Sequence, residues 1–138
     1  MSHMRTHCFR MRRGDDLRQS LERYVREQHI RAAVVLSAVG CVSRAVIRDA
    51  SGVTVHTLEE HLEIVSLMGT LSEERTHLHI ALSREDLSTV GGHLKDGCIV
   101  NTTAEVVLLE LSGVAFGADY DPETGYDELV ISHGEEPK

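Results

Sequence analysis

The segment THLHIAL (residues 76–82) alternates apolar and polar side chains, which is typical of a β-strand with one buried face. Its two histidines, His77 and His79, share the face opposite the aliphatic side chains. A third histidine, His93, follows fourteen residues after His79 and directly behind a Gly-Gly pair, where the backbone can approach a neighbouring strand closely. Three converging imidazoles suit Zn²⁺ or another divalent transition metal. This spacing predicts a metal site made by the three histidines.

The composition is that of one globular domain, because 138 residues, 41% of them hydrophobic, can bury a core without disulfides. No apolar run approaches the roughly 20 residues that a membrane-spanning helix needs, and the start lacks the apolar region of a signal peptide. We therefore expect a cytoplasmic protein, and we interpret residues 1–4 as an expression-tag remnant. Cys8, Cys41 and Cys98 are widely spaced and are expected to be reduced thiols.

The chain is acidic, since 14 lysines and arginines against 22 aspartates and glutamates give a formal net charge of −8. A protein that binds duplex DNA normally presents a basic face that replaces counterions on the phosphates. The charge therefore argues against a general DNA-binding function, although it is compatible with a local basic patch.

The hydrophobic periodicity predicts an α+β fold, in which a mainly antiparallel or mixed β-sheet carries one long amphipathic helix near the N-terminus. The helix is expected to run for about four turns from Leu17, capped by Asp15. Asp96-Gly97 is typical of a hairpin turn just after His93, and the glycines at 113 and 117 are expected to interrupt regular structure. Strands are predicted over residues 7–13, 32–36, 42–48, 53–57, 62–68, 76–82, 101–111 and 129–131, and a disordered tail over 132–138.

Seven short motifs occur along the chain in a fixed order. They are GDDL (14–17), SAVG (37–40), EIVSLMG (63–69), THLH (76–79), GGHL (91–94), TAEV (103–106) and TGYDEL (124–129). Together they resemble the plants-and-prokaryotes conserved (PPC) domain over residues 5–131, in the form of its prokaryotic single-domain members. The same domain occurs in plant AT-hook nuclear proteins, but the basic AT-hook itself is absent here. The resemblance implies a compact α+β domain that assembles as a homotrimer, with a metal, usually zinc, on His77, His79 and His93.

Two acidic residues, Glu63 and Glu105, interrupt otherwise apolar predicted strands. One interpretation is that their carboxylates hydrogen-bond to an imidazole and orient it toward the metal. The other is that they are satisfied polar groups at the seam between subunits of the trimer. The histidines have an alternative of their own, which is a polar patch at a subunit boundary with imidazoles bonded to carboxylates.

Three protein ligands would leave a fourth position on a zinc ion for water or a ligand atom. The first functional hypothesis is therefore a trimeric metal-binding module that binds a small ligand or a partner protein. The second is a metal-dependent enzyme that acts on a small anionic substrate, although no spacing identifies its general acid or base. The third, a DNA-binding protein associated with transcription, follows from the family resemblance and is disfavoured by the net charge.

Overall fold

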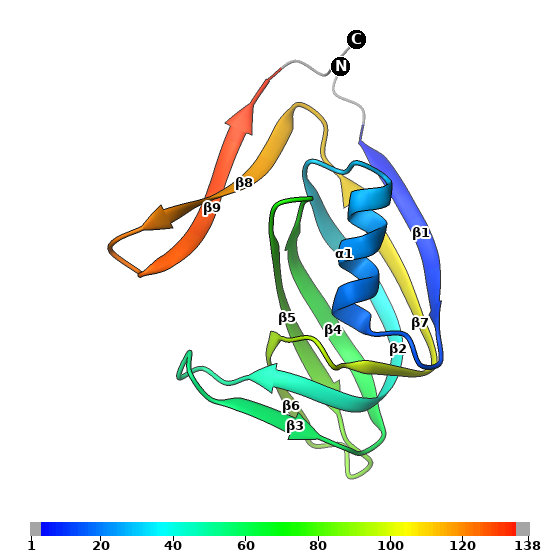
Figure 1. Cartoon of the computed structure of the whole chain (residues 1–138). Coiled ribbons are helices and arrows are strands. Elements are labelled where there is room, and N and C mark those ends of the chain that lie inside the picture. The colour runs from blue at the N-terminus through cyan, green and yellow to red at the C-terminus, as the bar shows by residue number, and fades with distance from the viewer. Residues whose placement is uncertain (1–3, 135–138) are drawn as a thin grey trace.

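The computed structural model describes residues 4–134, which form one helix, a seven-stranded sheet and a separate two-stranded hairpin (Figure 1). The strand pairings between these elements are antiparallel, which confirms the α+β prediction. The strands of the sheet are β1 (Arg5–Arg12), β2 (Ala33–Arg48), β3 (Val55–Leu58), β4 (Leu62–Leu71), β5 (Thr76–Ser83), β6 (Thr89–Leu94) and β7 (Ile99–Glu110). The hairpin consists of β8 (Val114–Asp121) and β9 (Tyr126–His133).

The helix α1 spans Leu17–Glu27, and its 11 residues make about three turns rather than the predicted four. It ends early because His29 adopts the left-handed region, with φ of 53°. The N-cap is Asp16 and not Asp15, since the Asp16 carboxylate accepts from the Gln19 N–H at 3.0 Å. Asp15 instead accepts from a backbone N–H at the end of β1. Within residues 4–134, no helix is long and apolar enough to cross a membrane.

The core lies between α1 and one face of the sheet (Figure 1). From the helix it receives Leu17, Leu21 and Val25, all fully buried. From β5 it receives the aliphatic side chains of the alternating segment, Leu78, Ile80 and Leu82. Burial of such a side chain is worth roughly 1.5–3 kcal/mol, so this face holds β5 in register. The three cysteines form no disulfide, as predicted, and one of them also lies in this core.

The central strand β2 closes a circuit of four strands, because β2 pairs with β4, β4 with β5, β5 with β6, and β6 again with β2. Gly91 and Gly92 make this closure possible. A Cβ at Gly91 would lie against the carbonyl oxygen of Ile80 in β5, and one at Gly92 against that of Arg48 in β2. The two glycines therefore allow β6 to lie between its neighbours and place Arg48 beside His93.

Three sequence predictions about connections were wrong. Asp96-Gly97 forms a turn but no hairpin, because β6 pairs with β5 and β2 while β7 pairs with β1 and β2. The segment 113–121 is not irregular, since strand pairing with β9 stabilises β8 despite its glycines. The tail predicted over 132–138 begins too early, because β9 extends to His133. Residues 135–138, and residues 1–3 of the predicted tag remnant, lie outside the described part of the chain.

Candidate metal centre

The three predicted histidines lie together at one end of the four-strand circuit. The pairing of β5 with β6 sets His79 directly opposite His93, and His77 lies on the same face two residues before His79. One ring nitrogen from each residue can be chosen so that all three lie within 4.8 Å of one another. The ring centroids are 5.1, 5.4 and 5.7 Å apart. Strand pleat and the glycine-mediated closure therefore bring together the side chains that the sequence singled out.

The cluster has the chemistry of a metal site. Its donors are three imidazoles, a set that suits zinc. Nitrogens bound tetrahedrally at about 2.0–2.1 Å from zinc lie about 3.4 Å apart, so small side-chain rotations would bring these rings into position. The Nδ1 atom of His93 is buried and has no hydrogen-bond partner among the described residues. A buried polar atom without a partner costs folding free energy. Coordination of a metal within the cluster would account for the placement of the His93 ring.

The surroundings of His77 and His93 favour the neutral imidazole, which is the form that binds a metal. Burial and the neighbouring charge of Arg48 lower the pKa of His93 to about 4. Burial and the charge of Arg75 also lower the pKa of His77, and the carboxylate of Glu128 opposes this only in part. Protonation therefore does not compete with metal binding at these two rings near neutral pH.

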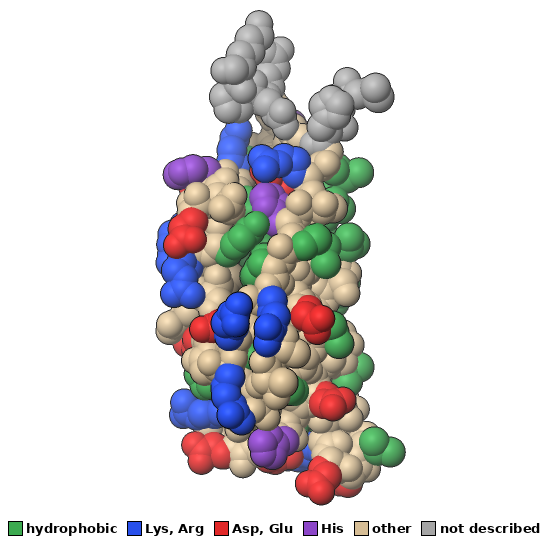
Figure 2. Space-filling view, turned by 90° about the vertical axis from the view of Figure 1, so that its right-hand side faces the viewer, with side chains coloured by type: hydrophobic (Ala, Val, Ile, Leu, Met, Phe, Trp, Pro, Cys, Tyr) green, Lys and Arg blue, Asp and Glu red, His purple; other side chains and the backbone are tan. Residues whose placement is uncertain are grey.

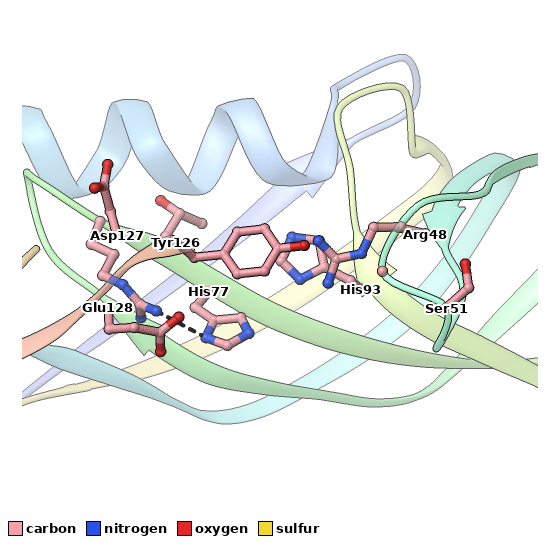
Figure 3. Close-up of a pocket in the computed structure, with 10 residues that line it drawn as sticks. Arg48, Ser51, His77, His93, Tyr126, Asp127 and Glu128 are labelled. Carbon is pink, nitrogen blue, oxygen red and sulfur yellow. Dashed lines mark hydrogen bonds between the residues drawn. The ribbon is translucent and has the colours of Figure 1, made fainter. Parts of the chain in front are cut away.

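A cavity of about 500 Å³ opens beside the histidines (Figure 3). Its walls include Arg48 at the end of β2, Arg75 directly before β5, and three successive residues of β9, Tyr126, Asp127 and Glu128. The hairpin reaches this position because it lies beside the loop between β4 and β5, with the Phe116 N–H donating to a backbone carbonyl before β2. Arg75 and the β9 residues were missed by the sequence analysis, although the TGYDEL motif contains the latter.

The two predicted acidic partners do not lie at the histidines. Glu63 is exposed and lies across from Cys41 and Ser83, and Glu105 is exposed and lies across from Arg10 and a residue of β2. Within residues 4–134 no hydrogen bond connects either carboxylate to the three rings. The carboxylates at the cavity come instead from β9.

The lowered pKa values predict that the metal-free protein loses stability in acid. Both rings take up a proton less readily in the folded chain than in the unfolded chain, where histidine titrates near 6.5. Protons therefore favour unfolding as the pH falls from about 6.5 toward about 4. Urea titrations of chelator-treated protein should show the free energy of unfolding falling over this interval, with a smaller fall in His93→Ala. Equal falls in both proteins would contradict this assignment.

The geometry defines a class of protein, an antiparallel sheet domain with three histidines from two adjacent strands beside an open cavity. Residues 1–112 match the Plants and Prokaryotes Conserved (PCC) domain. The chain therefore belongs to this family, as the motifs predicted. The match ends before β8, so the hairpin that supplies Tyr126, Asp127 and Glu128 lies beyond the matched range.

Similar proteins occur in bacteria and archaea. A hypothetical protein from Salmonella cholerae-suis has a TM-score of 0.92 and 33% identity, with 96% of each chain covered. A metal-containing protein from Archaeoglobus fulgidus has a TM-score of 0.78 and 32% identity, over 91% of this chain and 93% of that one. The bifunctional protein GlmU of Synechococcus sp. (strain JA-3-3Ab) is 44% identical over 128 residues, which are 93% of this chain but 21% of that protein. The chain thus spans about a fifth of this relative's length.

Proposed function

We propose that this chain is a metal-binding module that holds one divalent transition metal, with zinc as the first candidate, on His77, His79 and His93. The observation that carries the proposal is the gathering of three imidazoles whose ring nitrogens lie within 4.8 Å of one another, one of them with a buried unpartnered nitrogen. The similar Archaeoglobus protein, described as metal-containing, supports it. Elemental analysis of tag-free, nickel-free protein should find about one metal per chain, with zinc expected. A chain that takes up no divalent metal at neutral pH would overturn the proposal.

The cavity lined by His77 and His93 would give a small ligand access to such a metal, and the module would bind that ligand there. When bound, zinc supplies a Lewis acid that lowers the pKa of a coordinated water to about 7. The second candidate, a metal-dependent enzyme for a small anionic substrate, is favoured by one feature of the cavity. Asp127 and Glu128 lie on its wall and could accept or return a proton. DNA binding stays the weakest candidate because of the net charge of −8.

The module would self-associate as a homotrimer. The contact between subunits would be the face of the sheet opposite α1. We place this trimer in the cytoplasm. Leu36 and Val39 on β2, and Val65 and Met68 on β4, are each more than half exposed. The register that aligns Val34 with Thr70 and Cys41 with Glu63 sets the exposed β2 pair opposite the exposed β4 pair. Hydrophobic side chains gather along one side of the surface in Figure 2. An apolar patch of this kind on one sheet face is characteristic of a protein–protein interface.

This interface predicts that Val65→Arg breaks the oligomer. A charged side chain at an exposed apolar position costs little in the free chain, but burial at a subunit contact would leave it without a partner. Light scattering after size exclusion should give a trimer for the parent protein and a monomer for the variant. Leu87→Arg is the control, because Leu87 is 83% exposed in the loop between β5 and β6 and away from this face. A monomeric parent protein would contradict the trimer.

A further inference from the structure

Arg48, on the wall of the cavity beside the histidines, carries a positive charge with which no described carboxylate pairs. Arg48 lies at the end of β2, its Nε atom is buried without a hydrogen-bond partner, and within residues 4–134 no carboxylate forms an ion pair with it. The adjacent carboxylate of Asp49 is engaged elsewhere, by the Ser51 N–H at 2.9 Å and the His56 ring at 2.7 Å. A partly buried cation without a counter-charge is costly. Arg48 is therefore the cation of the cavity that is available to an anion.

A second guanidinium, that of Arg75, faces the same cavity and donates to Nδ1 of His77 at 3.3 Å (Figure 3). A neutral imidazole carries one N–H, so this donation places the proton of His77 on Nε2. A metal on Nδ1 would compete with Arg75 directly. A metal on Nε2 would require the proton to move to Nδ1, where it would meet the Arg75 N–H. Either mode of coordination therefore releases Arg75 from His77.

We propose that Arg48 and Arg75 form a binding subsite for a small oxyanion, a carboxylate or phosphate group, beside the three histidines. The inference rests on the proposed metal site, because metal binding frees Arg75 to turn to the anion. Guanidinium groups bind such oxyanions through charge-assisted, often bidentate, hydrogen bonds. A cavity of about 500 Å³ suits a small molecule rather than a polymer.

The residues of β9 on the wall of the cavity restrict what the rest of the ligand can carry. Tyr126, Asp127 and Glu128 come from β9, and in Figure 3 Asp127 lies at the far end of the cavity from Arg48. Carboxylates on this wall repel a second anionic group and accept hydrogen bonds from an amine or hydroxyl. The ligand class is therefore a small molecule with one oxyanionic group, a carboxylate or a phosphate, and a hydrogen-bond donor, and a molecule with two anionic groups such as a dicarboxylate is disfavoured.

The test measures anion binding and metal content separately. Isothermal titration of the zinc-loaded protein with inorganic phosphate, acetate and glycolate should show binding at one site per chain, with the strongest probe identifying the preferred oxyanion. Arg48→Gln and Arg75→Gln should each weaken that binding at least about tenfold while the zinc content and the melting temperature stay near those of the parent. Arg13→Gln is the control, because Arg13 is exposed and its side chain donates, among the described residues, only to Asn101.

The outcomes separate the two proposals. Loaded protein that binds none of the three anions, or variants that bind them as well as the parent does, would overturn the oxyanion subsite and leave the metal proposal standing. Chelator-treated protein should bind the probe more weakly than the loaded form, because Arg75 then remains on His77. Undiminished binding after removal of the metal would overturn the link between metal and Arg75. Failure to load zinc at all would overturn the proposed function itself, and with it this inference.

Discussion

His93→Ala is expected to remove the metal from the protein. The metal content should fall from about one per chain to a small fraction of that value, because two histidines on one strand form an incomplete zinc site. His93 is the ligand that comes from a different strand, and its partner across the ladder is His79. Its removal should not unfold the chain, since the ring lies outside the core that the aliphatic face of β5 builds. Elemental analysis and a competition titration with a chromophoric chelator measure the loss.

The matched control for this variant is His133→Ala. His133 is exposed at the end of β9 and lies outside the cluster. It should keep the full metal content and the parent's affinity. If His93→Ala retained the metal as well as His133→Ala does, the three rings would have to be explained as a polar patch, the alternative that the sequence left open.

Gly92→Ala is expected to damage the same site without changing any of the histidines. The new Cβ would lie against the carbonyl oxygen of Arg48, at the point where β6 joins β2. Rigid backbone cannot yield as a flexible side chain does, so β6 must shift, and overpacking of this kind costs about 1–3 kcal/mol. Urea denaturation should show this loss of stability. Metal affinity should fall with it, because His93 follows Gly92 directly and moves with the strand.

Gly134→Ala is the control for the glycine experiment. A Cβ there has no atom of residues 4–134 within 4 Å, and the backbone at Gly134 is not in the left-handed region. It should unfold at the same urea concentration as the parent protein and bind metal equally well. If the two glycine variants had equal stability, the closure of β6 against β2 would not depend on the missing side chain.

Features that depend on residues close together in the sequence were predictable. The period of two in residues 76–82 correctly assigned the buried and exposed faces of β5, because side-chain direction in a strand follows from the local backbone. The amphipathic helix was predicted with its buried face, although its cap and its end were each placed incorrectly. Those errors concern single residues whose backbone angles depend on neighbouring contacts, as His29 illustrates.

Features that depend on contacts between distant segments were not predictable. Nothing near Arg48 in the sequence indicates that β2 will meet β6. Glu63 and Glu105 were chosen because they interrupt apolar strands, yet both lie on exposed positions away from the rings. The carboxylates that do face the cavity lie on β9, directly before the short strand predicted over residues 129–131.

The donor atoms of the candidate site follow from residue order alone, since alternation and a Gly-Gly pair were sufficient to select three histidines. The cavity around the three histidines does not follow from residue order. Arg48, Arg75 and the β9 carboxylates reach the cavity through strand pairing between distant segments and through the position of the β8–β9 hairpin. Both depend on how the whole sheet assembles and not on the residues next to each side chain in the sequence. Charge and shape at the site, which determine what it can bind, are therefore properties of the assembled sheet.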